Sequence, residues 1–328
     1  MAISAQKIDL WGRTGIELAA KTVSLVIAPE IGGRVISLKL DGEEIFFSLP
    51  ELRGKPFPIQ NAQDILALKK ELGWLHYGGY KTWLAPQARW TEGLPFLDLD
   101  SGSYEYEISD SRANPVVRLH SPVCRETGIQ LTRTLSMDDA GIVTVEQGMT
   151  NRSSKVVEWG LWDVTQVCGP GRVMLPTNPA SRYSGGVKAY ASEGRSPEVI
   201  DRYVNREKNV ALVTCHQTEP FKYGTDSTEG WILGLLDKGG DQWIAYLKGF
   251  ETEPGEIYPH EVVVEVYDSG TLPYFEIEVH SPLKRLRPGA SYRYTETWVL
   301  GRLSKKTTMK TITEWVRTTV GSKLDLNR

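Results

Sequence analysis

The sequence predicts an all-β protein of two stacked antiparallel sheets with a C-terminal helix. Short β-like runs separated by Gly, Pro, Asn and Asp recur along most of the chain. Helical periodicity is scarce outside the C-terminal segment. Because so many strands in one sheet would curl or split, we expect two sheets packed face to face.

The first predicted strands lie in the segment 22–47, TVSLVIAPEIGGRVISLKLDGEEIFF. A turn at Pro-Glu-Ile-Gly-Gly separates the first two strands. The pair Asp41–Gly42 indicates a hairpin, because both residue types tolerate positive φ at a tight turn. The remaining predicted strands span 104–109, 115–120, 128–137, 142–150, 155–167, 209–215, 231–236, 242–249, 261–267, 273–280 and 291–300.

Two segments have helical character. Residues 61–73 predict a short helix, with Gly73 placed to end it. Residues 305–321 repeat apolar side chains at helical spacing, which gives one face to pack on a sheet. The residues of that face are Met309, Ile312, Val316 and Val320. Since no linker or fixed-period repeat divides the chain, we expect one β domain over 1–304, with a helix in 305–328 packed on the same domain.

The composition favours a globular protein of the cytoplasm. The net charge of −3 provides no basic surplus for nucleic acid. The first residues lack a secretory signal pattern, and no run approaches the roughly 20 apolar residues that span a bilayer. Cys124, Cys168 and Cys215 have no metal-ligand spacing and are expected to be reduced thiols. We therefore expect no nucleic acid or membrane partner, no cofactor and no locally encoded metal site; the oligomeric state is left open.

The segment 74–87, WLHYGGYKTWLAPQ, is the most distinctive candidate site. It combines aromatic rings, adjacent glycines, a lysine and one of only five histidines. Aromatic rings and a few convergent polar groups are typical of a cleft for a flat, hydroxylated ligand such as a sugar. The side chains that this segment offers to a small carbohydrate are His76, Tyr80, Lys81, Trp83 and Gln87.

Three segments resemble the aldose 1-epimerase (galactose mutarotase)-like superfamily, and more closely an uncharacterised bacterial branch of it. PEIGGRVISLKLDGEEIFF resembles the N-terminal hairpin, and LHYGGYKTWLAPQ resembles the Leu-His-Gly-Gly stretch followed by Lys and Trp. YFEIEVHSPLKRLRPGASYRYTETWVL is similar to the closing strand pair, while NRSSKVVEWGLWDVTQV and FKYGT fit the uncharacterised branch. The resemblance implies a β-supersandwich of the galactose mutarotase type, with a sugar cleft across the concave sheet.

The resemblance also implies site residues. In the superfamily, a glutamate acts as base and a histidine as acid to open and reclose a hemiacetal ring. Glu276 is the best match for the base, and Glu278 is its neighbour on the same strand face. His76 matches a sugar-contacting histidine, and Arg34 stands where members place a cleft-lining arginine. Lys222 of FKYGT matches the uncharacterised branch. Gly224, two residues later, predicts a tight turn that presents the lysine amine.

In the epimerases, the strand that resembles EWGLWDVTQV carries the catalytic histidine. In this sequence, Trp162 and Asp163 stand at about the position of that histidine. An indole is not a proton donor of the required kind, so the acid is expected to be His76 or His260. Asp163 is expected at the sugar, where it could act as an acid if burial raised its pKa.

The sequence thus predicts a carbohydrate-binding, epimerase-like enzyme acting on a sugar or sugar acid by Glu/His acid–base catalysis. A non-catalytic carbohydrate-binding protein is one alternative, favoured by Trp162. A polysaccharide lyase-type enzyme on the same fold is another, with Lys81 and Arg34 neutralising a uronate carboxylate.

Overall fold

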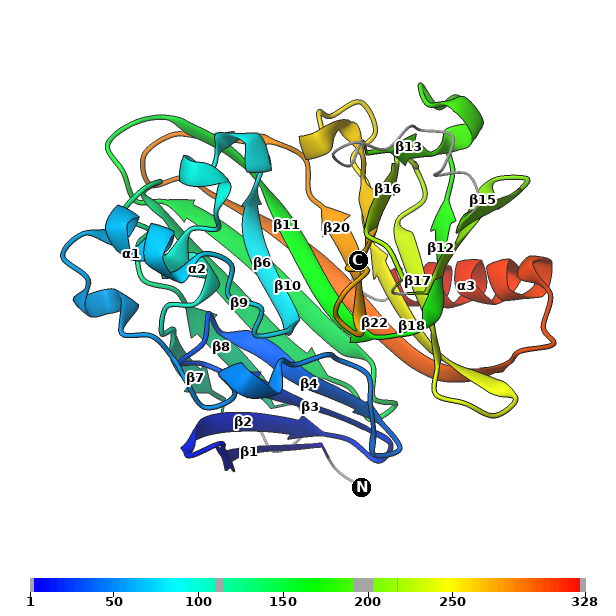
Figure 1. Cartoon of the computed structure of the whole chain (residues 1–328), viewed down its shortest axis with the longest axis horizontal. Helices are drawn as coiled ribbons and strands as arrows, with labels where there is room; N and C mark the ends of the chain where they lie inside the picture. Colours follow the sequence, from blue (N-terminus) through cyan, green and yellow to red (C-terminus); the bar gives the residue numbers. More distant parts are fainter. Residues whose placement is uncertain (1–2, 110–114, 191–202, 217, 325–328) are drawn as a thin grey trace.

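The structure, a computed structural model, describes residues 3–109, 115–190, 203–216 and 218–324. Two large antiparallel sheets stack in layers, and a helix near the C-terminal end packs beside them (Figure 1). The predicted all-β fold class with a C-terminal helix is confirmed.

Among the described residues, the first sheet has twelve strands. The short strand β5 (Glu43–Glu44) pairs with β4, and β21 (Lys284–Leu286) pairs with β11. In spatial order, the others are β1 (Ser4–Leu10), β2 (Arg13–Ala19), β3 (Val23–Ala28), β4 (Arg34–Leu40), β6 (Gly79–Ala85), β11 (Val157–Cys168), β20 (Tyr274–His280), β19 (Val264–Asp268), β16 (Phe221–Thr225) and β13 (Lys188–Ala189).

In the part of the chain that the structure describes, the second sheet has ten strands. Its order is β14 (Val204–Glu207), β15 (Val210–Cys215), β12 (Gly171–Pro176), β17 (Trp231–Asp237), β18 (Gln242–Phe250), β22 (Ser291–Ser304), β10 (Val143–Asn151), β9 (Ile129–Met137), β8 (Val116–His120) and β7 (Glu105–Ile108).

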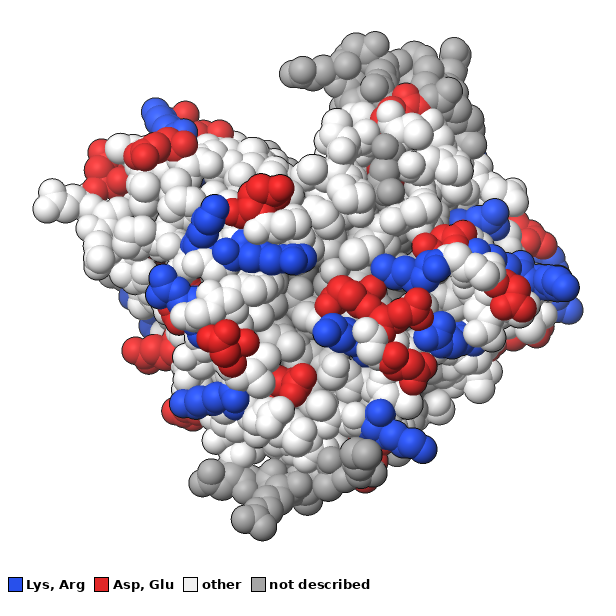
Figure 2. All heavy atoms as spheres, turned by 60° about the horizontal axis from the view of Figure 1, so that its bottom comes forward, with Lys and Arg blue, Asp and Glu red and all other residues white. Residues whose placement is uncertain are grey.

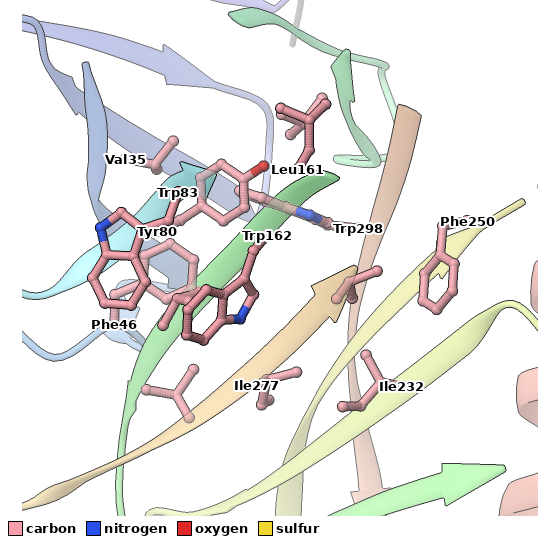
Figure 3. Close-up of a cluster of buried hydrophobic side chains, with 14 of the residues drawn as sticks. Val35, Phe46, Tyr80, Trp83, Leu161, Trp162, Ile232, Phe250, Ile277 and Trp298 are labelled. Atoms are coloured by element: carbon pink, nitrogen blue, oxygen red, sulfur yellow. The ribbon is translucent and has the colours of Figure 1, made fainter. Parts of the chain in front are cut away.

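Aromatic rings fill the space between the sheets (Figure 3). Tyr80 on β6 meets Trp298 on β22 edge to face, with ring centroids 4.7 Å apart. Phe46 contacts the same indole at 6.0 Å. Each ring buries a large apolar area, and edge-to-face contacts are a favoured geometry for such pairs. The face of β6 that carries Tyr80 is therefore the face turned toward the second sheet.

A buried ionic group also crosses the layers. The ammonium of Lys248 on β18 donates to Asp163 on β11 and lies 3.4 Å from Glu296 on β22. Burial, reinforced by Glu296, raises the pKa of Asp163 well above its usual range. Burial also raises the pKa of Glu296, but Lys248 outweighs that effect and leaves its pKa lowered. One lysine thus compensates two carboxyl groups that differ in proton affinity.

The helices have identifiable end signals. In α1 (Ile65–Leu72), the Asp64 side chain accepts from the backbone N–H groups of Leu66 and Ala67, both at 3.0 Å. Gly73, with φ of 59°, ends this helix as predicted. The helix α2 (Leu97–Asp100) is a single turn. The helix α3 (Met309–Leu324) begins four residues later than the segment 305–321 suggested, and it packs on β17 and β18.

The FKYGT segment differs from its predicted tight turn. It forms β16, in which Gly224 pairs with Glu265 of β19. A Cβ at Gly224 would lie 3.0 Å from the Val262 side chain, so this glycine permits close packing rather than a turn. Seven further strands of the described residues were not predicted from the sequence: β1, β2, β6, β12, β13, β14 and β21.

Charges of both signs are interspersed on the molecular face drawn in Figure 2.

Cys124 and Cys215 are buried, Cys168 is partly buried, and all three are free thiols. None of the described helices has the length and apolar composition needed to cross a membrane.

The glycine pair before β6 allows two backbones to approach each other. Gly78 has φ of 94°, and a Cβ there would lie only 2.0 Å from the carbonyl oxygen of Phe47. Gly73 also has positive φ, but a Cβ at that position would meet nothing within 4 Å.

We predict that Gly78→Ala lowers the free energy of unfolding by about 3 kcal/mol or more, because strain and a backbone clash combine. Gly73→Ala, the matched control, should cost about 1 kcal/mol from strain alone. Urea denaturation of both variants measures the difference, and equal losses would contradict the packing argument.

Replacing Lys248 with Met should leave Asp163 and Glu296 buried without their cation. We expect a loss of about 3–5 kcal/mol of unfolding free energy at pH 7. The loss should diminish toward about pH 4, where these carboxyl groups are protonated in the unfolded chain as well. Urea denaturation at pH 7 and pH 5 tests this, with Lys70→Met, an exposed position, as control. A deficit that is independent of pH would contradict the electrostatic explanation.

Candidate functional site

A cavity of about 330 Å³ opens on the face of the first sheet that is turned away from the second sheet. Side chains alternate along β6, so Lys81 and Trp83 face this cavity while Tyr80 and Thr82 face the other sheet. The lining residues come from five strands and the segments over them: Trp74, Leu75, His76, Lys81, Trp83, Gln87, Pro95, Asp100, Trp162, Gln166, Lys222, Tyr267, Tyr274 and Glu276.

The strand register builds the floor of the cavity. Gly79 of β6 pairs with Gln166 of β11, which pairs with Glu276 of β20. Glu276 in turn lies opposite Tyr267 of β19, which lies opposite Lys222 of β16. Four polar side chains from distant parts of the sequence therefore form one row across the sheet.

The neighbouring row is mostly covered. Lys81 and Glu278 both pair with Val164 of β11, and Glu278 lies opposite Glu265. Glu278 and Glu265 are fully buried, whereas Lys81 reaches the cavity. This row supplies charge beside the row that forms the cavity floor.

Glu276 is held by its neighbours while remaining at the cavity surface. Its Oε1 accepts a hydrogen bond from the side-chain amide of Gln166 at 2.8 Å. The ammonium of Lys81 lies 3.7 Å from the same oxygen. The carboxylate is thereby oriented, but its second oxygen has no hydrogen-bond partner among the described residues and is available to a ligand.

Two nitrogen-bearing side chains beside Glu276 have altered proton affinity. Burial lowers the pKa of Lys81 to about 8, although the Glu276 charge opposes the change. Burial and the charge of Lys81 together lower the pKa of His76. At neutral pH, His76 is therefore a neutral imidazole, and Lys81 is an ammonium close to its titration point.

Indole rings make the apolar wall. Trp83 and Trp162 pack edge to face with centroids 5.0 Å apart, and Trp74 contacts Trp83 at 5.8 Å. The N–H of Trp83 donates to Asp100 at 2.6 Å, and the N–H of Trp162 donates to Glu278 at 2.7 Å. Both indoles are fixed by carboxyl groups, so these rings cannot reorient without breaking a buried hydrogen bond.

Arg34 supports the wall from behind. Its guanidinium is fully buried, donates to Asp100 at 2.7 Å and also donates to the carbonyl of Gly78 at 3.1 Å. Asp100 then accepts from Trp83. The arginine thus positions an aromatic wall and does not line the cavity.

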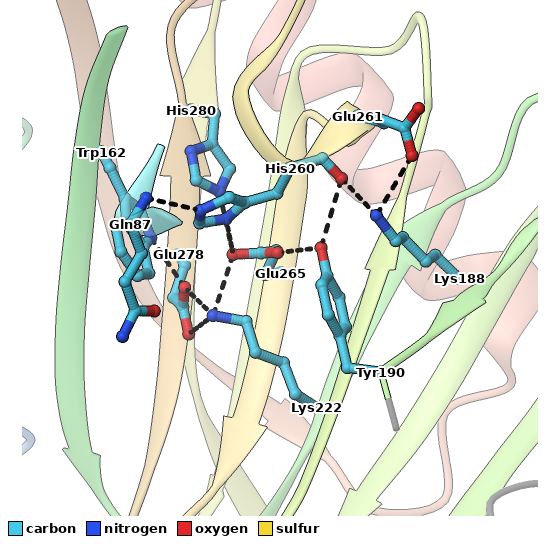
Figure 4. A network of polar contacts seen from close by, with 10 residues as sticks. All are labelled: Gln87, Trp162, Lys188, Tyr190, Lys222, His260, Glu261, Glu265, Glu278 and His280. Carbon is cyan, nitrogen blue, oxygen red and sulfur yellow. Dashed lines mark hydrogen bonds and ion pairs between the residues drawn. The ribbon is translucent and has the colours of Figure 1, made fainter. Parts of the chain in front are cut away.

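A polar network lies next to the cavity (Figure 4). The ammonium of Lys222 is 2.9 Å from Glu265 and 2.8 Å from Glu278. Burial lowers the pKa of Lys222, but these two carboxyl groups outweigh that effect and raise it. Burial raises the pKa of Glu278 well above its usual range. The network therefore keeps Lys222 charged and favours the protonated form of Glu278.

His260 belongs to this network. The backbone N–H of Gln87 donates to its Nε2 at 3.2 Å, so this nitrogen is an acceptor and the ring proton is on Nδ1. Nδ1 lies 3.3 Å from Glu265, and Nε2 of His280 lies 2.9 Å from the same carboxylate. Burial lowers the pKa of His280 to about 4, so it is neutral at pH 7.

His260, Glu265 and His280 are the one group of three potential metal ligands found within the described residues. Their ligand atoms lie within 4.8 Å of one another. Glu265, however, already contacts the ammonium of Lys222 at 2.9 Å, and both histidines bond to it. A lysine thus supplies the positive charge that a metal would bring, and these residues do not fit a metal site well.

The structure brings seven of the residues proposed from the sequence to the cavity: His76, Lys81, Trp83, Gln87, Trp162, Lys222 and Glu276. Five others do not line it. Arg34 lies behind the wall, and Glu278 and His260 are in the adjacent network. Tyr80 and Asp163 face the second sheet, because each is one residue out of phase with the cavity side of its strand.

Four cavity-lining residues were not predicted from the sequence: Gln166, Tyr267, Tyr274 and Asp100. Gln166 has the same strand parity as Trp162, and Tyr274 has the same parity as Glu276, so alternation alone could have suggested these two. Tyr267 is placed by its pairing opposite Glu276, which only the register reveals.

A second hollow, of about 490 Å³, is lined by residues that include 252–258. Its side chains include Glu253 and Glu256, which are already paired with Lys284. It lacks the indole wall, and ligand sites typically combine apolar walls with a few convergent polar groups. We therefore take the smaller cavity as the candidate site.

Solved structures with this fold include a galactose mutarotase-like protein from Clostridium acetobutylicum. It is 11% identical, with a TM-score of 0.57, over 92% of this chain and 99% of that one. A candidate aldose 1-epimerase from Klebsiella pneumoniae is 12% identical, with a TM-score of 0.58, over 94% of this chain and 84% of that one. The fold is therefore galactose mutarotase-like.

A TPR-domain containing protein from Parabacteroides distasonis is also similar, at 15% identity and a TM-score of 0.54. The match covers 88% of this chain but only 47% of that protein, so this chain spans about half its length. No curated protein matches the sequence. Residues 105–301 match a family described as a domain of unknown function, and the chain accordingly belongs to the DUF4380 family.

Proposed function

We propose that the protein is an epimerase-like enzyme that binds a small carbohydrate, a sugar or sugar acid, and interconverts its α and β anomers. The observation that carries this proposal is the position of Glu276, an oriented carboxylate at the surface of a tryptophan-lined cavity. The galactose mutarotase-like fold supports it. The free thiols fit a reducing compartment, so we place the reaction in the cytoplasm.

Anomer exchange requires a base for the proton of the anomeric hydroxyl and an acid for the ring oxygen. Glu276 has the position for the base, because it is reachable from the cavity and held by Gln166. Of the two acids expected from the sequence, His76 lines the cavity. Both ring nitrogens of His260 are engaged by Gln87 and Glu265.

The cavity is suited to one sugar ring. Its volume of about 330 Å³ is near the lower end of typical ligand sites. The indoles of Trp83 and Trp162 offer apolar surface, while Gln87, Lys81 and the second oxygen of Glu276 offer hydrogen bonds. This combination suits a ligand with one apolar face and a hydroxylated rim.

A plain carbohydrate-binding protein is the second candidate. It is favoured by Trp162, which stands where the epimerases have a histidine and whose N–H is committed to Glu278. Such a protein would bind a sugar without accelerating exchange, and this difference is measurable.

We predict that the protein accelerates α/β exchange of at least one member of a panel of hexoses, hexose phosphates and uronic acids, as measured by NMR exchange spectroscopy. Glu276→Gln should lower that rate by about 10²–10⁴-fold, because a positioned proton transfer is lost. Glu105→Gln, at an exposed position on β7, is the matched control and should retain the rate.

An unchanged rate in Glu276→Gln would remove the base assignment. Line broadening without faster exchange would identify a binding protein. If neither effect is found with any sugar of the panel, polymeric substrates and lyase assays come next.

Trp74, 41% exposed, offers a ring beside His76 at the cavity. Trp74→Ala should weaken sugar binding about threefold to tenfold, as expected for loss of one aromatic contact worth about 0.5–1.5 kcal/mol. Titration calorimetry measures the affinity. Ile257→Ala, in the larger hollow, is the control. If Ile257→Ala weakens sugar binding and Trp74→Ala does not, the sugar binds in the larger hollow.

A further inference from the structure

Lys81 and Lys222 both line the cavity, but their ammonium groups differ in their hydrogen bonds and ion pairs. Only 4% of Lys81 is exposed, and its Nζ makes no hydrogen bond to any described residue. Its contacts are the Glu276 carboxylate at 3.7 Å and the face of the Trp83 ring at 4.4 Å. Lys222, in contrast, donates to Glu278 and pairs with Glu265. The three N–H groups of Lys81 are therefore available to a ligand in the cavity.

The other candidate acids are poorly suited to protonate a ring oxygen. Trp162 has only an indole N–H, which is bonded to Glu278. His260 has both nitrogens engaged. The lowered pKa of His76 leaves its imidazole without the second proton at neutral pH. The raised pKa of Lys222 makes its ammonium a weak acid.

We propose that Lys81 is the catalytic acid, working with Glu276 on the two oxygens attached to the anomeric carbon. This inference rests on the proposed epimerase function. The short separation of Lys81 and Glu276 matches two oxygens that share one carbon. The sugar would lie over the row formed by Gln166 and Glu276, with the Trp83 ring beside the ammonium.

The proton transfers balance over one cycle. Glu276 takes the proton of the anomeric hydroxyl, the bond from the anomeric carbon to the ring oxygen breaks, and that oxygen takes a proton from Lys81. The products are the open-chain aldehyde, a protonated Glu276 and a neutral Lys81 amine. After rotation of the aldehyde, the ring hydroxyl returns its proton to Lys81 and attacks the other face. Glu276 then returns its proton to the former aldehyde oxygen, which becomes the new anomeric hydroxyl.

The charges around Lys81 set the pH range of this role. The groups that act on it come from β20, β4, α2 and the segment before β6, and they are Glu276, Glu278, Arg34, Asp100 and His76. Burial dominates and places the pKa of Lys81 at about 8. An acid must be protonated to act, so the exchange rate should be retained below that pH and fall above it.

The test compares Lys81→Arg with the wild-type protein over pH 6–10, on the sugar with the fastest exchange. Arginine keeps the positive charge but does not release its proton in this range. We expect kcat to fall by about 10²-fold or more, KM to change little, and the decline above pH 8 to disappear. Lys70→Arg, at an exposed position, is the matched control and should keep both kcat and the decline.

The outcomes separate this inference from the proposed function. If Lys81→Arg retains kcat and the alkaline decline while Glu276→Gln loses activity, Lys81 is not the acid and the epimerase function stands. A comparable loss in His76→Gln with no loss in Lys81→Arg would assign the acid to His76. Absence of exchange in the wild-type protein would overturn both proposals. Should Lys81→Arg fail to fold, a wild-type rate that stays level to pH 10 would by itself overturn the inference.

Discussion

The alternation of side chains along β6 and β11 is the constraint on which the rest of the structure depends. Each strand has one face in the space between the sheets and the other in the cavity. Tyr80 and Asp163 therefore join the buried layer that holds the sheets together, while Lys81 and Trp162 line the cavity. A shift of either strand by one residue would exchange these two sets, so the same register fixes both stability and site geometry.

Charge compensation is the second organising principle. Three separate lysines lie near buried carboxyl groups, yet they differ in how tightly they are held. Lys248 is enclosed between the sheets with Asp163 and Glu296, and Lys222 is bonded to two carboxyl groups. Lys81 has only one longer ion pair. The difference in contacts leaves the Lys81 ammonium available to a ligand, whereas the other two ammonium groups are committed to buried carboxyl groups.

The fold class could be predicted from the sequence because strand runs and turn residues are local signals. The segment 74–87, several of whose residues line the cavity, was singled out for the same reason. Tyr80 and Lys81 were both assigned to the ligand, although adjacent strand residues point to opposite faces; β6 had not been recognised as a strand. The partnership of Glu265 with Lys222 could not be read from the sequence, because it depends on which strands pair and in which register.

The network around Lys222 has an evolutionary consequence. Loss of the lysine alone would leave Glu265 and Glu278 buried together, and loss of Glu265 alone would leave two histidines and an ammonium without their shared partner. Either single change is strongly unfavourable, whereas a joint replacement by apolar residues is not. We therefore expect relatives to keep or discard this group as a unit, so that its members co-vary among homologous sequences.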